Sequence, residues 1–313
     1  MTRPRLFYTD QHVLPLPGEH KFPIRKYRLL REMLEADQVF EFQPAPLAAP
    51  ATIELVHSRE YVSAFLEGRL DAAAIRKIGF PWSPELVTRT LASVGGTLAA
   101  TEEALLSGWG GTLAGGTHHA FATEGSGFCV FNDIAVAIRS LHAKASIDRA
   151  AVIDLDVHQG DGTAHIFRDD SLVLTLSIHC KNNFPLRKQV SKIDVELNAG
   201  VRDEEYLSVL SSVLPKVWDF EPEIVFYQSG VDGLQSDVLG KLDLSLEGLR
   251  ARDREVMRGV KALNVPFVIT LGGGYSHPIE LTSEAHANTF RIAREILGKP
   301  FETVPIPAGQ SST

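Results

Sequence analysis

The chain has 313 residues, 44% of them hydrophobic and 22% charged, which is the balance of a globular protein that can bury a large core. Its net charge of −8 argues against a nucleic-acid surface and is compatible with a cationic partner. The sequence has no apolar run of about 18 residues and no segment typical of a signal peptide, so we expect a cytoplasmic protein without a membrane partner. Because it has only two cysteines, we do not expect a disulfide framework.

The predicted elements alternate between strands and helices. Buried strands are expected at RLFY (5–8), AAVIDLDV (150–157), LVLTLSIH (172–179), EIVFYQSG (223–230) and PFVITLGGG (266–274), and helices at 25–36, 83–108, 132–145, 205–220 and 246–264. The strands are apolar on both faces, which favours a parallel sheet covered on both sides. We therefore expect one α/β domain over residues 1–303, followed by a flexible tail at 304–313. Ligands of such sheets bind beyond the carboxyl ends of the strands.

His118 and His119 follow a glycine-rich, strand-like segment, GGTLAGGTHHAF. Adjacent side chains of an extended chain point in opposite directions, so two functional histidines need separate orienting partners. Asp154 and Asp161 are carboxylates available for this purpose. The alternative is a pair of surface histidines. The next segment, EGSGFCVFND (124–133), predicts a close-packed loop with an aromatic wall.

The segment AVIDLDVHQGDGT (151–163) places Asp156 and His158 at the mouth of a buried strand. Residues two apart on an extended chain face the same way, so both side chains are able to reach one metal ion. The alternative is that the aspartates cap the following turn. Asp232, in YQSGVDGLQSD, follows another strand and is predicted to supply a third ligand. Two oxygens and one imidazole leave an open position on a tetrahedral Zn²⁺, as in catalytic sites.

The last clear strand ends in LGGGYS (271–276), where three glycines precede Tyr275. Glycines give the backbone freedom to bring this hydroxyl toward a polarised carbonyl group. A packed tyrosine on an ordinary turn is the alternative. No Walker A motif, Rossmann fingerprint or G-x-S-x-G elbow is present, so the sequence does not favour a nucleotide-binding protein or a serine hydrolase.

Taken together, GGTHHA, GFCVFND, DLDVHQGDGT, SGVDGLQSD and LGGGYS resemble the histone deacetylase family in order and register. The sequences DLDVHQG and GVDGLQSDVLGKLDLSLEGLRARD look most like those of the class IV branch and its bacterial relatives. The resemblance implies a single arginase-like α/β domain with a mostly parallel sheet. It also implies hydrolysis of an N-acyl amide, usually acyl-lysine, by zinc-activated water.

Carried over by motif, the resemblance makes Asp156, His158 and Asp232 the zinc ligands. It implies that His119 is the general base and acid, supported by Asp161, and that His118, paired with Asp154, is an electrostatic partner. Tyr275 would donate to the carbonyl oxygen. The implied tunnel and ion residues complete the set: Gly127, Phe128, Phe184 and Leu239 for the acyl-lysine tunnel, Asp154, Asp156, His158, Ser177 and Ile178 for a potassium ion, and Phe167 and Val173 for a second such ion.

The sequence departs from the family pattern at two places. Gln159 stands where other branches carry a second histidine, as in the class IV pattern. The rim aspartate that binds the substrate backbone in many relatives has no clear counterpart in RKIGFPWSPEL (76–86), so the resemblance does not imply tight recognition of a peptide main chain.

The expected substrates are therefore an acyl-lysine protein or peptide, or a small acylated amine. An acetylpolyamine deacetylase is the alternative enzyme, although the chain is too compact for the insertion that usually shapes such channels. A catalytically silent acyl-binding or metal-binding protein is the third hypothesis.

Overall fold

A single sheet of parallel strands forms the centre of the computed structural model, which describes residues 3–298. The strand order is β2-β1-β3-β8-β7-β4-β5-β6, and every neighbouring pair is parallel. The strands are β1 Arg5–Tyr8, β2 Glu41–Pro44, β3 Trp109–Thr112, β4 Ala150–Asp154, β5 Val173–Cys180, β6 Ile193–Leu197, β7 Ile224–Gln228 and β8 Phe267–Thr270. The predicted parallel α/β sheet is confirmed, and the predicted tail at 304–313 lies outside the described residues.

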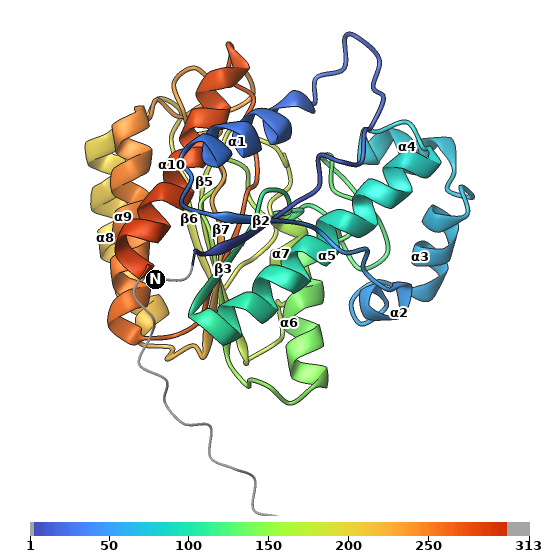
Figure 1. The fold of residues 1–313 in the computed structure, drawn as a ribbon. Helices are drawn as coiled ribbons and strands as arrows, with labels where there is room; N and C mark the ends of the chain where they lie inside the picture. The colour runs from blue at the N-terminus through green and yellow to red at the C-terminus, as the bar shows by residue number, and fades with distance from the viewer. Residues whose placement is uncertain (1–2, 299–313) are drawn as a thin grey trace, which may run out of the picture.

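Helices cover both faces of the sheet (Figure 1). The helices are α1 Arg25–Ala36, α2 Pro50–Ile53, α3 Arg59–Leu66, α4 Ala72–Ile78, α5 Pro84–Ser107, α6 Asp133–Ala143, α7 Asp161–Ile166, α8 Asp203–Trp218, α9 Leu246–Leu263 and α10 Ile279–Leu297. One hydrophobic cluster lies between the sheet and α1, α8, α9 and α10, and a second lies between the sheet and α5 and α6. Helices α2 to α4 lie farther out, beside α5. Within residues 3–298, no helix is long and apolar enough to cross a membrane.

The ends of α5 follow from local sequence signals. The Ser83 side chain accepts a hydrogen bond from the Leu86 N–H, and Pro84 occupies the first turn, where its missing N–H costs nothing. Gly108 ends the helix in the left-handed conformation that glycine adopts most readily. The five predicted helices are all present, with ends within three residues of those expected.

Two strands and a long helix were not predicted, for different reasons. β2 and β6 are the edge strands of the sheet and consist mostly of exposed and partly buried residues, so neither has the apolar run that marked the others. α10 buries small and polar side chains, including Thr282, Ser283, His286 and Asn288. These polar residues interrupt the hydrophobic residues of its buried face, which include Phe290, Ile292 and Leu297.

Three predicted strands are shorter than expected. β4 ends at Asp154 rather than at 157, because the Asp156 N–H turns back to donate to Asp154 Oδ1 at 3.1 Å. β8 ends at Thr270 rather than at 274, and Gly272 then adopts a φ of 109°. β7 ends at Gln228 rather than at 230. The strand-like segment before the paired histidines also stops early, at Thr112. The site residues therefore lie on loops beyond the strands.

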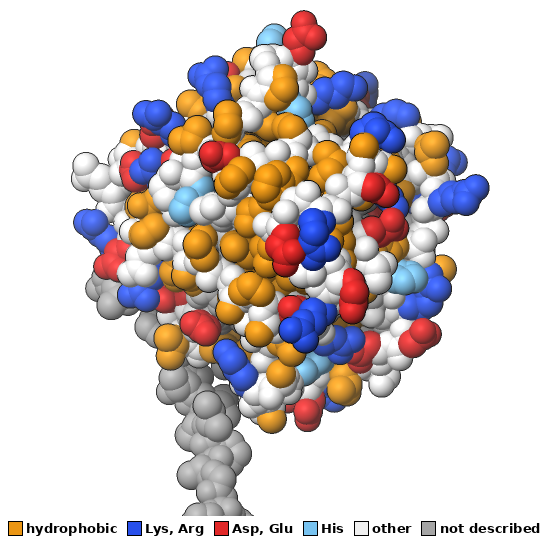
Figure 2. Space-filling model, turned by 90° about the vertical axis from the view of Figure 1, so that its right-hand side faces the viewer, with side chains coloured by type: hydrophobic (Ala, Val, Ile, Leu, Met, Phe, Trp, Pro, Cys, Tyr) orange, Lys and Arg blue, Asp and Glu red, His pale blue; other side chains and the backbone are white. Residues whose placement is uncertain are grey.

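The face that carries α2 to α4 has a mixed surface (Figure 2). Lysine and arginine side chains lie among aspartate and glutamate side chains, with hydrophobic side chains gathered between them. A surface of this kind does not generate the strong single-sign field that attracts a polyanion.

Gly110 in β3 is a test of the packing between the sheet and α5. A Cβ at Gly110 would overlap the carbonyl oxygen of Ala100 in α5. We expect Gly110→Ala to lower the free energy of unfolding by about 1–3 kcal/mol, because an added methyl group in a filled core forces the backbone to shift. Gly18→Ala is the control, since nothing lies within 4 Å of its added Cβ. Urea denaturation of both variants measures the difference; equal stabilities would contradict this packing.

Candidate active site

The predicted site residues meet at the carboxyl edge of five neighbouring strands. These strands, β3, β8, β7, β4 and β5, are consecutive in the sheet. The segments that follow them carry the paired histidines after β3, Tyr275 after β8, Asp232 after β7, Asp156 and His158 after β4, and Phe184 after β5. Residues far apart in the sequence therefore come together at one edge of the sheet, as expected for open α/β folds.

Asp156, His158 and Asp232 form a group able to hold a metal ion. One ligand atom from each residue lies within 4.8 Å of the others. His158 Nδ1 is 3.0 Å from Asp156 Oδ1 and 3.0 Å from Asp232 Oδ2. The prediction that these residues converge agrees with the structure, but its stated reason was wrong. Asp156 and His158 do not share one side of a strand, because β4 ends at Asp154 and both residues lie on the loop that follows it.

Backbone contacts hold the two carboxylates in place. The Val157 N–H donates to Asp232 Oδ1 at 2.9 Å, and the Gly273 N–H donates to Asp156 Oδ2 at 2.6 Å. A Cβ at Gly273 would overlap Asp232 Oδ2. This close approach explains why the segment after β8 is rich in glycine.

The electrostatics of this group favour a cation. Burial opposes protonation of His158, but its hydrogen bonds with Asp156 and Asp232 raise its pKa to about 10. Burial and the charge of Asp156 raise the pKa of Asp232 to about 7. Two buried carboxylates therefore attract positive charge between them. The donor set of two oxygens and one imidazole fits Zn²⁺ or a related divalent ion, which would bind His158 as neutral imidazole.

The adjacent histidines are each paired with a different carboxylate. His118 Nδ1 lies 2.7 Å from Asp154 Oδ2, and His119 Nδ1 lies 2.7 Å from Asp161 Oδ1. All four side chains are buried, and the two rings are 4.1 Å apart between centroids. The prediction that Asp154 and Asp161 orient the two histidines therefore agrees with the geometry, and the surface-histidine alternative does not.

Their environments move the two pKa values in opposite directions. Burial and the nearby charge of His118 lower the pKa of His119 to about 4. Burial also opposes the charge on His118, but Asp154 and Asp156 outweigh it and raise its pKa to about 9. At neutral pH, His119 is therefore a neutral imidazole. Its Nδ1–H donates to Asp161, which leaves the Nε2 lone pair free to accept a proton.

Asp133 supports the histidine loop and was not predicted. Its carboxylate accepts hydrogen bonds from the backbone N–H groups of Gly116 and Thr117, at 2.9 and 2.7 Å, and from the hydroxyls of Thr97 and Thr117. Gly116 adopts a φ of 74° at this turn. The available signal was an aspartate in the first turn of a predicted helix. Such a residue is ordinarily interpreted as part of the helix start, because a negative charge there is favourable.

Tyr275 lies at the pocket on a segment that is held from two sides. Its backbone N–H donates to Asp237 Oδ2 at 2.6 Å. Lys26 Nζ donates to the Gly272 carbonyl at 3.1 Å and lies 5.3 Å from the centroid of the Tyr275 ring. Burial and the charge of Asp232 raise the pKa of the Tyr275 hydroxyl well above its usual value, so it stays a donor. Neither Asp237 nor Lys26 was predicted.

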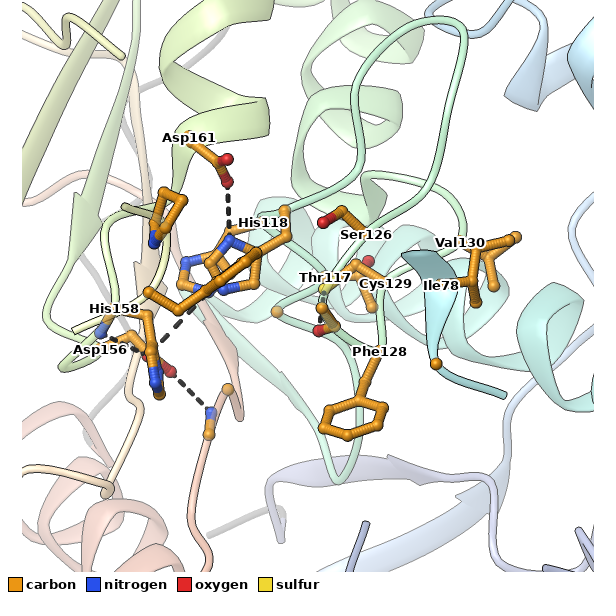
Figure 3. A pocket seen from close by; sticks show the side chains of 18 of the residues that line it. Ile78, Thr117, His118, Ser126, Phe128, Cys129, Val130, Asp156, His158 and Asp161 are labelled. Carbon is orange, nitrogen blue, oxygen red and sulfur yellow. Dashed lines mark hydrogen bonds and ion pairs between the residues drawn. The ribbon is translucent and has the colours of Figure 1, made fainter. Parts of the chain in front are cut away.

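A pocket of about 1000 Å³ reaches from the surface to these residues. In Figure 3, His118, Asp156, His158 and Asp161 lie at one side of the pocket, and Ile78, Phe128, Cys129 and Val130 lie at the other. The predicted tunnel residues Gly127, Phe128, Phe184 and Leu239 all line it. Gly127 and Phe128 have φ values of 54° and 65°, which confirms a tight loop beside the aromatic wall. One polar wall and one apolar wall suit an amide at the end of an aliphatic chain.

The predicted potassium residues lie beside the histidine pairs. Ser177 is the neighbour of Asp154 across β4 and β5, and its hydroxyl is 3.0 Å from His179 Nδ1. Ile178 lies next to it on β5 and is fully buried. Phe167 and Val173, proposed for a second ion, are also fully buried. Ion binding at either place stays a prediction.

The Gln159 side chain forms hydrogen bonds with the loop before β6 and with β6 itself. Its side-chain amide donates to the Gln189 carbonyl and to Asp194 Oδ1, each at 2.8 Å, and its oxygen accepts from the Gln189 N–H. Gln159 thus fixes the loop before β6 and leaves the metal group untouched.

Comparison with known proteins gives consistent matches. The sequence model of the histone deacetylase domain matches residues 20–292. The chain is 43% identical over 294 residues to an uncharacterized protein of Picosynechococcus sp., across 92% of this chain and 98% of that protein. It is 32% identical to histone deacetylase 2 of Arabidopsis thaliana, across 82% of this chain and 70% of that protein. It is 31% identical to the longer histone deacetylase 6 of the same plant, across 75% of this chain and 54% of that protein.

Proposed function

Because the chain belongs to the histone deacetylase family, we propose that it is a zinc-dependent hydrolase that removes acyl groups from acyl-lysine side chains. Membership supports the general activity, which is removal of acyl groups from lysine-like substrates. One observation supports the finer proposal: the group Asp156, His158 and Asp232 shares one pocket with the His119 and Asp161 pair. Gln159 favours the class IV branch of the family.

In this proposal, Asp156, His158 and Asp232 hold the zinc ion. When bound, zinc supplies Lewis acidity, which polarises an amide carbonyl and makes a water molecule easier to deprotonate. A potassium ion near Asp154, Ser177 and Ile178 would add positive charge behind the site. The fit of the donor set and the attraction of the two buried carboxylates for positive charge support the assignment.

His119 moves the proton. Its free Nε2 accepts a proton from the attacking water and returns it to the leaving amine nitrogen, while Asp161 holds the ring and its tautomer. His118, paired with Asp154, keeps a positive charge beside the reacting group. Tyr275 donates to the carbonyl oxygen as negative charge develops there.

The substrate side chain would lie between the aromatic walls. Phe128 and Phe184 flank the pocket, and the Phe184 side chain is part of its exposed mouth. Of the carboxylates that line the described pocket, Glu124 lies outside the catalytic cluster, and it is paired with Lys77 at 2.6 Å. The described pocket therefore has no carboxylate outside the catalytic cluster that lacks a partner, which supports recognition through the acylated side chain rather than through a rim carboxylate.

Tyr275→Phe tests this mechanism. We expect kcat to fall roughly 10²–10³-fold with metal content unchanged, because the variant loses one oxyanion donor and no metal ligand. The substrates are ε-N-acyl-lysine peptides, from acetyl to myristoyl, beside N-acetylputrescine. Tyr8→Phe is the matched control, because Tyr8 is not a pocket residue.

The outcomes separate the hypotheses. Turnover of an acyl-lysine peptide that collapses in Tyr275→Phe supports the proposal, and the preferred acyl length reports the depth of the pocket. Cleavage of the polyamine alone would favour the acetylpolyamine deacetylase. Zinc binding without any turnover would favour the silent binding protein.

A further inference from the structure

Arg89 is a buried cation that no part of the proposed mechanism uses. It lies near the start of α5 and lines the same pocket as Asp156 and His158. Its exposed fraction is 8%, whereas that of Leu186, another residue lining the pocket, is 92%. Arg89 therefore belongs to the solvent-shielded part of the pocket, and Leu186 to its mouth.

Arg89 lacks a counterion among the described residues. Its guanidinium carbon lies 4.3 Å from the centroid of the Tyr27 ring, the neutral Tyr27 hydroxyl is a hydrogen-bond partner, and Nη1 reaches the Thr9 hydroxyl at 3.5 Å. Asp10, whose negative charge acts on Arg89, is bound by Arg31 at 2.8 Å instead. Arg252, the second buried arginine among the described residues, pairs with Asp253 at 2.9 Å.

An unpaired buried guanidinium is costly and selects for an anion. A buried charge is normally stabilised by a partner of opposite charge, and the guanidinium has five N–H donors in a planar fork. That fork matches a carboxylate, which it binds through two parallel hydrogen bonds. Thr90 and Ser93, on the same helix, add hydroxyl groups to this part of the pocket. A second buried cation, Lys26, lies 5.4 Å from the same Tyr27 ring and donates hydrogen bonds to the carbonyl groups of Gly272 and Gly274.

The orientation of the substrate in the pocket determines which carboxylate is able to reach Arg89. The lysine side chain enters from the mouth, and its amide lies at the metal group. The acyl group therefore extends past the amide toward the solvent-shielded part of the pocket, where Arg89 lies.

We propose that Arg89 is a specificity-determining residue that binds the terminal carboxylate of dicarboxylic acyl groups, such as succinyl or glutaryl, on lysine. The proposal rests on the hydrolase function above. Water adds its hydroxyl to the acyl carbon, the C–N bond breaks, and the amine nitrogen takes the proton. The products are lysine and a free dicarboxylic acid.

The test compares each acid with its neutral isostere. Peptides carrying ε-N-succinyl-lysine or ε-N-glutaryl-lysine are assayed beside peptides in which the terminal carboxylate is a carboxamide of the same shape. For the wild type, we expect kcat/KM to be at least about tenfold higher for the acid, because a charge-assisted pair forms in a buried site. Arg89→Met should reduce this ratio to one or less, and Arg89→Lys should retain part of it. Circular dichroism and turnover of the carboxamide peptides check that each variant folds.

Several outcomes would overturn the proposal. One is a wild-type preference for the carboxamide, and another is an acid-to-amide ratio that Arg89→Met leaves unchanged. A third outcome would show that the carboxylate bound by Arg89 is that of the free acid product rather than that of the substrate. If Arg89→Met weakens inhibition by acetate but leaves the ratio intact, Arg89 receives the departing acid and does not select the substrate.

Binding measurements separate this proposal from the proposed function. Calorimetric titration of the acid and carboxamide peptides into wild type and Arg89→Met gives the same comparison without turnover. Absence of hydrolysis with metal bound would refute the hydrolase. Equal binding of the two peptides by the wild type would refute the role of Arg89.

Discussion

Asp232→Asn is expected to remove the bound metal and to lower kcat/KM for an acyl-lysine peptide by about 10³-fold or more. An amide in this place cannot supply the anionic oxygen that faces His158 Nδ1 at 3.0 Å. The buried group would lose one of the two carboxylates that attract a cation, and Lewis acidity worth several kcal/mol would be lost with it. Metal content by mass spectrometry and turnover by peptide assay measure the two effects.

Asp243→Asn is the matched control for this substitution. Asp243 pairs with the exposed Arg202 at 2.8 Å and is not a pocket residue. It should retain its metal and its activity. Full metal content and normal turnover in Asp232→Asn would show that the metal group is elsewhere. Loss of metal without loss of turnover would instead contradict the metal-dependent mechanism.

The parts of the site that local patterns encode could be predicted from the sequence. Apolar runs predicted the parallel strands, and the polar residues at their ends predicted the carboxyl edge where the metal group and the histidine pairs lie. The need of each imidazole for a carboxylate, with Asp154 and Asp161 available, followed from the residues, whereas the resemblance implied which carboxylate pairs with which histidine. In each case, the proposed site residues lie just beyond a strand that the sequence predicts.

The supporting residues could not be predicted, because their roles depend on contacts between distant segments. Lys26 bonds to the Gly272 carbonyl across 246 residues of sequence, and nothing in RKYRLLREMLEA distinguishes it from a surface lysine. Arg89 likewise falls within an ordinary helix pattern. Its lack of a carboxylate partner becomes visible only once α5 is packed against the loop after β1. The strand ends were also misjudged, since the turns there depend on hydrogen bonds to aspartate side chains.

His119→Ala is expected to lower kcat by roughly 10²–10⁴-fold while the protein keeps its metal. The reason is the contrast between the two histidines. The low pKa of His119, about 4, leaves Nε2 unprotonated at neutral pH, whereas the carboxylates around His118 raise its pKa to about 9. The first is therefore able to accept a proton from water, and the second already carries one.

His118→Ala is the matched comparison, because the two rings are neighbours and each has one carboxylate partner. It should reduce kcat less than His119→Ala, since it removes an electrostatic partner and leaves the proton acceptor in place. The kcat of Asp161→Asn should fall between those of the two alanine variants. Its KM and metal content should stay close to the wild type, because Asp161 positions His119 without touching the substrate. If His118→Ala had the larger effect on kcat, the two roles would be reversed, and proton transfer would have to start from the histidine that Asp154 holds.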